Sequence, residues 1–149
     1  MAFDGIVIAN LAKELNHKLA DGRITKIAQT ESDKLLLTIK KSISSPEQKT
    51  IRTQNRLVIS VNPSLPLLYL TQENQNAPLQ APTFCMVLRK HLNNCKINLI
   101  EQIGLERVLC MHLEHLNEMG DYCRKKLYIE LMGKHSNIIF CDENDQIID

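Results

Sequence analysis

Two histidines, His112 and His115, stand three residues apart and carry the imidazole nitrogens that zinc prefers. Alternating apolar residues around them predict a β-strand, in which residues three apart point to opposite faces. The two rings therefore cannot easily share one metal ion. A further histidine, His91, lies in the apolar stripe of a predicted helix, which favours a hydrogen-bonded core histidine over a ligand. We predict no metal site.

The cysteines are odd in number and widely spaced, with no C-x-x-C pair among them. A disulfide framework or a tetrahedral zinc site would need closer or paired spacing. We interpret them as small apolar side chains of a reducing compartment. They are Cys85, Cys95, Cys110, Cys123 and Cys141.

Motifs of catalysis and nucleotide binding are absent from the sequence: it has no G-x-G-x-x-G, no Walker A and no G-x-S-x-G. Ser136 directly follows His135, whereas a catalytic triad needs the two side chains to converge. Nothing in composition or spacing identifies an enzyme, and we predict no catalytic residue and no cofactor.

Basic residues are concentrated in one stretch of the chain. Residues 34–56 carry six lysines and arginines and one glutamate, Glu47. The whole chain of 149 residues has a net charge of +1, which argues against a generic polybasic nucleic-acid binder. Two interpretations of this stretch stay open, a solvated hairpin and a contact to a phosphate backbone. The six are Lys34, Lys40, Lys41, Lys49, Arg52 and Arg56.

A short polar segment with Lys134 and His135 interrupts two predicted strands, close to Glu130 at an exposed strand position. Turn residues on a rigid sheet are well placed to contact a ligand. A tight hairpin explains the same residues, because Gly133 can supply an unusual backbone angle and Asn137 can hydrogen-bond locally. The pattern alone favours neither interpretation.

Two helices are expected to flank the strands. The first begins at Asp4, whose carboxylate can cap the first turn, and ends at Asp21-Gly22, where glycine tolerates a left-handed residue. Its apolar residues recur at helical spacing. The second helix covers residues 83–94.

Strands are predicted at 23–28, 35–40, 56–61, 67–70, 108–113, 125–132 and from 138 to 141. Residues 41–49 look like a polar hairpin loop, and 72–82 look like a connector rich in Asn, Gln and Pro. Parallel strands need long crossovers, which are scarce here. We expect an α+β domain with an antiparallel β-sandwich or open barrel and flanking helices.

The location is expected to be cytoplasmic. The first ten residues have no basic residue before their apolar stretch, unlike a secretory signal. No window approaches the ~20 apolar residues that cross a bilayer, so no membrane partner is expected. The sequence stops inside an expected hairpin, and we therefore expect a fragment of a longer protein.

Five segments, in order, resemble the N-terminal NFACT module of the family that includes RqcH, fibronectin-binding protein A and NEMF. They are residues 1–5 (MAFDG), 22–27 (GRITKI), 84–92 (FCMVLRKHL), 100–107 (IEQIGLER) and 132–139 (MGKHSNII). Together they indicate that residues 1–149 are one such module.

The resemblance implies a binding platform in ribosome quality control. Family proteins bind the large ribosomal subunit that holds a stuck peptidyl-tRNA, recruit tRNA, mainly alanyl-tRNA, and support a C-terminal alanine tail. The ribosome makes the peptide bond, so the resemblance implies that the module is not an enzyme. Helix-hairpin-helix, coiled-coil and NFACT-R parts follow in the family chain. The fold is expected to be similar to the N-terminal domain of formamidopyrimidine-DNA glycosylases.

The family's RNA-contact residues fall on specific positions of this chain. Its Asp-Arg pair falls on Glu106-Arg107, its exposed Glu and turn Arg fall on Glu130 and Lys134, beside His135, and its early acid falls on Asp4. Glu at 106 reaches one methylene further than Asp. Lysine at 134 can meet a phosphate but cannot form arginine's two-pronged contact to a base edge. Helix capping also explains Asp4.

Two other functions are considered against this one. A fibronectin-binding surface adhesin is the older family label, and the missing secretory signal argues against it. A DNA-repair enzyme would need an N-terminal proline amine and an adjacent glutamate, whereas Ala2 and Phe3 stand here. We therefore predict no glycosylase or lyase activity.

Overall fold

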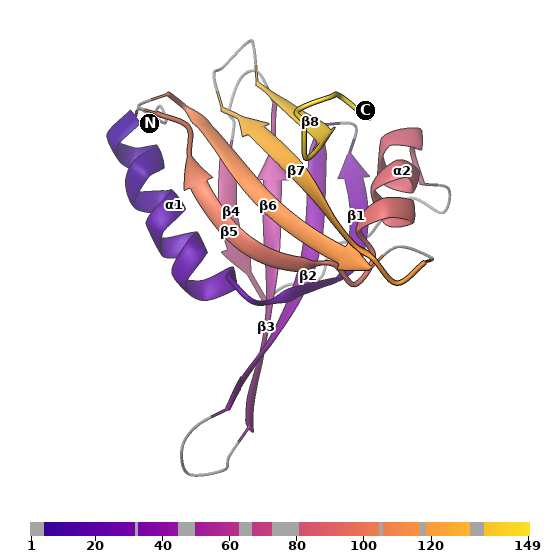
Figure 1. Cartoon of the computed structure of the whole chain (residues 1–149). Helices are drawn as coiled ribbons and strands as arrows, with labels where there is room; N and C mark the ends of the chain where they lie inside the picture. The colour runs from indigo at the N-terminus through magenta and orange to yellow at the C-terminus, as the bar shows by residue number, and fades with distance from the viewer. Residues whose placement is uncertain are drawn as a thin grey trace.

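The computed structural model describes residues 5–31, 33–44, 50–62, 67–72, 81–104, 106–116, 119–131 and 136–149. Two helices and eight strands follow one another in these segments (Figure 1). The first half of the chain holds α1 (Gly5–Leu19), β1 (Arg23–Glu31), β2 (Lys34–Ser44), β3 (Thr50–Ser60) and β4 (Leu67–Thr71). The second holds α2 (Thr83–Leu92), β5 (Lys96–Gln102), β6 (Val108–Leu116), β7 (Tyr122–Glu130) and β8 (Asn137–Asp142).

The strands form one open antiparallel sheet in the order β4-β3-β2-β1-β5-β6-β7-β8. The predicted α+β class and antiparallel pairing are confirmed. Each half is a meander, and the two meanders meet through a single residue pair, Arg23 with Lys96. The sheet folds at this seam, so that β5–β8 lie in front of β1–β4 (Figure 1).

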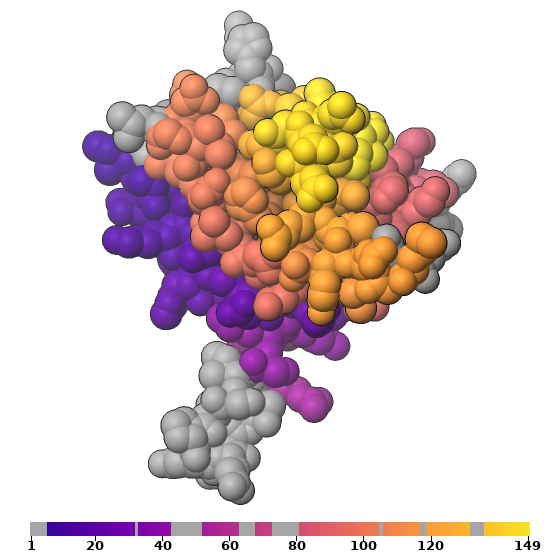
Figure 2. Space-filling model, viewed as in Figure 1, coloured from indigo at the N-terminus to yellow at the C-terminus, as the bar shows by residue number. Residues whose placement is uncertain are grey.

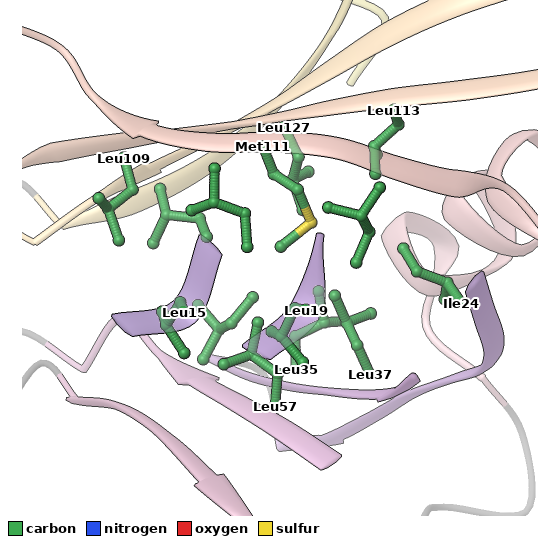
Figure 3. Close-up of a cluster of buried hydrophobic side chains, with 14 of the residues drawn as sticks. Leu15, Leu19, Ile24, Leu35, Leu37, Leu57, Leu109, Met111, Leu113 and Leu127 are labelled. Carbon is green, nitrogen blue, oxygen red and sulfur yellow. The ribbon is translucent and has the colours of Figure 1, made fainter. Parts of the chain in front are cut away.

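The core lies between the two halves of the sheet and is aliphatic. Leu109 and Met111 on β6 face Leu35 and Leu57 on β2 and β3 across it (Figure 3). All four side chains are buried. Alternation explains this, because every second residue of a strand points to the same face.

Each helix closes one open side of this core (Figure 1). α1 lies against β5, where the amide of Ile100 donates to Oδ1 of Asn16 at 2.9 Å. α2 lies against β1, where Nε of Arg89 donates to the carbonyl of Ile27 at 2.7 Å. The helix of each half of the chain therefore packs against the first strand of the other half.

Three expectations about element bounds are corrected by the structure. β5 was not expected. The polar segment 41–44 belongs to β2, so the β2–β3 hairpin is longer than predicted, and its tip at 45–49 lies outside the described residues. At the end of α1, the left-handed residue is Asp21, with φ 69°, and not Gly22.

Candidate nucleic-acid interface

The Glu106-Arg107 pair lies in the turn that joins β5 to β6. The amide of Ile103 donates to the carbonyl of Val108 at 3.0 Å, and the amide of Glu106 donates to the carbonyl of Ile103 at 3.1 Å. Nε2 of Gln102 donates to the carbonyl of Glu106 at 2.8 Å. The backbone of the turn is thus fixed, while the side chains of Glu106 and Arg107 are exposed.

Glu130 lies at the end of β7, beside the same turn. Its backbone is paired with Val108 on one side and with Asn137 on the other. The next residue, Leu131, donates its amide to the carbonyl of Arg107 at 2.9 Å. Three of the six candidate residues are therefore neighbours at one end of the sheet, although they are far apart in sequence.

Asp4, Lys134 and His135 lie outside the described residues, and their roles stay predictions. The described residues next to them show where the chain leads. β7 ends at Glu130 and β8 begins at Asn137, which pairs with Glu130, so the connection that holds two of them leaves and re-enters the sheet at this pair.

The first turn of α1 points toward this end of the molecule as well. α1 runs antiparallel to β5, because Asp21 after the helix contacts Ile97 at 2.7 Å and Asn16 contacts Ile100 at 2.9 Å. Earlier residues of α1 therefore lie beside later residues of β5. In Figures 1 and 2 the start of α1 and the β5–β6 turn share the upper left of the molecule.

The chemistry of this end is recognition by charge and hydrogen bonds. The guanidinium of Arg107 has a planar fork of donors that fits a phosphate or the edge of a guanine. The carboxylates of Glu106 and Glu130 accept hydrogen bonds, as from the amino group of an unpaired cytosine. Arranged on a fixed turn, these groups suit the backbone and exposed bases of folded RNA.

A second polar group, on the outer face of β5–β7, was missed by sequence reasoning. Nε2 of His112 lies 3.1 Å from Oε1 of Glu101 on the neighbouring strand. Oδ1 of Asp145 accepts from the hydroxyl of Tyr128 at 2.6 Å and from Nζ of Lys126 at 3.1 Å. These two hydrogen bonds hold the pKa of Asp145 below its usual value.

This second group holds structure together, because these polar contacts are made within the group: Tyr128 and Lys126 donate to Asp145, and His112 pairs with Glu101. Asp145 follows β8 in sequence, so its carboxylate fixes the C-terminal turn onto β7. His115 lies three residues from His112 along the strand and so points to the opposite face. The pKa of His91 is lowered by burial first, and then by the charges of Lys125, Lys90 and His115. The described residues hold no cluster of three metal-ligating side chains.

Two of the thiols, those of Cys95 and Cys110, are poor nucleophiles. All five cysteines are free, and four of them are buried. Burial raises the pKa of Cys95 to about 12 and that of Cys110 to about 11. A thiol that stays protonated at neutral pH neither attacks a substrate nor binds a metal readily.

Comparison with protein families shows a match over residues 4–149 to the family described as NFACT N-terminal and middle domains. A curated relative, the Rqc2 homolog RqcH of Bacillus subtilis, is 38% identical over 148 residues, which are 99% of this chain and 24% of that protein. The chain therefore spans about a quarter of the length of this relative.

Two solved structures share the fold. The N-terminal domain of fibronectin-binding protein PavA from Streptococcus pneumoniae has a TM-score of 0.86 and 36% identity, over 99% of this chain and 53% of that one. The N-terminal part of the fibronectin/fibrinogen-binding protein from Streptococcus suis has a TM-score of 0.88 and 33% identity, over 99% and 52%. No helix among the described residues is long and apolar enough to cross a membrane.

Proposed function

We propose a function from the premise that this chain belongs to the NFACT N-terminal domain family of RqcH and the fibronectin-binding proteins. It is an RNA-binding module of a ribosome-associated quality-control factor in the cytoplasm. The observation that carries the proposal is the 38% identity to an Rqc2 homolog over 99% of the chain.

The proposed partners are tRNA, chiefly alanyl-tRNA, and the large ribosomal subunit with its stalled peptidyl-tRNA. In this proposal the module binds and positions tRNA, and the ribosome makes the peptide bonds of the alanine tail. NFACT-R and coiled-coil parts of a full-length chain would hold the same tRNA from another side. The module itself supplies no catalytic group.

We assign the tRNA contact to the end of the sheet that carries Glu106, Arg107 and Glu130, together with Asp4, Lys134 and His135. The closeness of Glu106, Arg107 and Glu130 supports this assignment, because the amide of Leu131, next to Glu130, donates a hydrogen bond to the carbonyl of Arg107. Arg107 would meet a phosphate or a guanine edge, and the glutamates would accept from base amino groups.

The test is the affinity for alanyl-tRNA of an Arg107→Ala variant, measured by fluorescence anisotropy over a range of salt. We expect binding about tenfold weaker, and a log–log salt slope smaller by about 0.7–0.9 if the lost contact is to a phosphate. Arg124→Ala is the matched control, because it removes another exposed arginine whose nearest carboxylate, on Glu114, lies 3.8 Å away. Arg124→Ala should bind as the parent does.

Equal binding by Arg107→Ala and the parent would overturn the assignment of the site. Failure of the parent chain to bind tRNA, together with no co-sedimentation of the full-length protein with large subunits that hold peptidyl-tRNA, would overturn the function. Circular dichroism and thermal melting of each variant establish that it is folded.

A second candidate function rests on the two similar solved structures, which are of proteins named for binding fibronectin. Immobilised fibronectin discriminates the two functions in a surface plasmon experiment. The RNA proposal predicts no saturable binding to fibronectin. Saturable binding that tRNA does not displace would favour adhesion.

Similarity to the N-terminal domain of formamidopyrimidine-DNA glycosylases stays a prediction about the fold only. Ala2 and Phe3 replace the proline and glutamate of that chemistry. Borohydride reduction in the presence of damaged DNA should trap no covalent adduct. A trapped adduct would contradict the binding-only function.

A further inference from the structure

Toward the hairpin end of β1–β3, away from Glu31 and Lys34, five cations share the outer surface, and we call this part of the surface the basic face. It consists of Arg23, Lys26, Lys40, Arg52 and Arg56. The strand register aligns them in rows, with Arg23 opposite Lys40, and with Lys26 and Arg56 on either side of Thr38.

Alternation along the strands places the five on the outside. Ile24, Ile39 and Leu57, which directly follow or precede three of these cations in sequence, are buried in the core with at most 1% of their surface exposed. Residues one position away must point to the opposite face of the sheet. The side chains of Lys40 and Arg52, the two cations toward the tip of the hairpin, are exposed.

The cations of the basic face lack described carboxylate partners. In the described part of the chain, ion pairs form elsewhere, as between Lys18 and Glu14 or between Lys126 and Asp145. Two adjoining hollows cross this surface and share Lys40 and Gln54. The residues that line both hollows are lysines, arginines, hydroxyls and one amide, and none is acidic.

Two arginines of this face are held in place by backbone carbonyls. A guanidinium nitrogen of Arg23 donates to the carbonyl of Asn94 at 3.0 Å, and one of Arg56 donates to the carbonyl of Gln72. A guanidinium has five donors, so several remain for a ligand. Neutral carbonyls fix the position of these charges without cancelling them.

The shape of the hairpin makes the basic face accessible. β2 and β3 extend beyond the rest of the molecule toward the bottom of Figure 1. Alternate residues along a strand are about 7 Å apart, so the strands present their cations at regular intervals. A polyanion can therefore lie along the rows and meet several cations in turn.

We propose that the basic face is a second RNA contact, which binds the phosphate backbone without reading sequence. This rests on the proposed function, because it takes RNA as the ligand, and it adds a surface on different strands from Arg107. No aromatic residue for base stacking lies on the basic face. Among the side chains that the structure describes, the exposed large apolar ones lie outside β1–β3, which favours RNA over a membrane surface.

The test compares two variants of equal charge, K40E/R52E on the basic face and K13E/K90E on the two helices. Each is titrated against a 20-nucleotide oligouridine and against tRNA by fluorescence anisotropy over a range of salt. We expect K40E/R52E to weaken binding of both RNAs by at least about tenfold, and to lower the salt slope by about 1.4 for two lost contacts to a single strand. K13E/K90E should weaken it by no more than about threefold.

The outcomes separate this inference from the proposed function. Equal oligouridine binding by K40E/R52E and K13E/K90E overturns the inference and leaves tRNA binding at Arg107 intact. Oligouridine binding that needs the basic face, with no tRNA or ribosome binding by the parent, supports the inference and overturns the function. No binding of either RNA by the parent overturns both.

Two further arms complete the test. Vesicles of phosphatidylcholine and phosphatidylserine replace RNA in one arm. If the parent binds these vesicles but not oligouridine, and K40E/R52E abolishes the vesicle binding, the surface is a membrane contact and the inference is overturned. The neutral K40Q/R52Q is measured in the other, so that the conclusion stands if the reversed variant fails to fold. It should bind oligouridine more weakly than the parent.

Discussion

The hydroxyl of Tyr128 donates a 2.6 Å hydrogen bond to Oδ1 of Asp145, across 17 residues of sequence. Nζ of Lys126 donates to the same oxygen at 3.1 Å. Asp145 itself has a left-handed backbone, with φ 64°. One carboxylate therefore joins a strained turn after β8 to the outer face of β7.

Replacing Tyr128 with Phe should raise the pKa of Asp145 toward its ordinary value, because the hydroxyl is the largest cause of the lowered pKa. The lowered pKa stabilises the fold above the unfolded-state value, and this share is lost as pH falls through the folded-state pKa. The variant should therefore lose less stability on acidification below pH about 4. Carboxyl NMR titration of Asp145 checks this, and an unchanged titration in Tyr128→Phe would contradict it.

His91 predicts a second pH dependence at milder acidity. Its ring packs against Phe140 at 5.7 Å, and its pKa is lowered by burial and then by the charges of Lys125, Lys90 and His115. The unfolded state then binds more protons, so stability falls as pH drops below about 6.5. In urea titrations at pH 7.5 and 5.5, His91→Gln should lose less stability than the parent. An equal loss in both would contradict the prediction.

Gly22→Ala should destabilise the fold by about 1–3 kcal/mol through overpacking. An added Cβ would stand 2.8 Å from Cγ2 of Ile39 and 3.0 Å from the carbonyl of Leu19. Urea unfolding measures the change. Gly104→Asn is the control, because its Cβ meets nothing within 4 Å and asparagine tolerates the φ of +57°. A loss in Gly22→Ala no larger than in this control would show that the site relaxes freely.

Thiol labelling should follow burial. Cys123 is the one cysteine of the five that is not fully buried, and it should react first with iodoacetamide at pH 8. Cys95 and Cys110 should stay unmodified until urea unfolds the chain, because burial raises their pKa values to about 12 and 11. Mass spectrometry of digests taken over time measures the order. Early modification of Cys95 would contradict it.

The fold was predictable where the spacing of apolar residues is regular. The prediction was wrong where an irregularity of the backbone interrupts that spacing. Both helices and the pairing of neighbouring strands follow from such periodicity. β5 was not predicted because a register irregularity between Ile97 and Leu99 interrupts the alternation of apolar and polar residues. Its buried residues, Ile97 and Ile100, are three apart and do not read as a strand.

The prediction for the polar end of the β2–β3 hairpin was wrong for a different reason. Ser42 and Arg52 are polar because that part of the ladder extends beyond the body, and no core lies beneath it to demand apolar residues. The composition of a loop and that of a solvated ladder are alike. The backbone pairing between strands separates them.

The candidate interface was predictable only through resemblance to a family. Glu106, Arg107 and Glu130 have no signature spacing, and their proximity comes from the pairing of Val108 with Glu130. The Tyr128–Asp145 contact could not be predicted at all, because it depends on the path of a turn after the last strand.

The exchanged helices have a consequence for how the molecule unfolds. α1 belongs in sequence to the first meander but covers the first strand of the second, and α2 does the reverse. Neither half, cut between residues 72 and 81, would retain the helix that seals its own open side. Each half covers an open side of the core of the other, so loosening either half exposes the core of both. The domain should therefore unfold in one cooperative step rather than half by half.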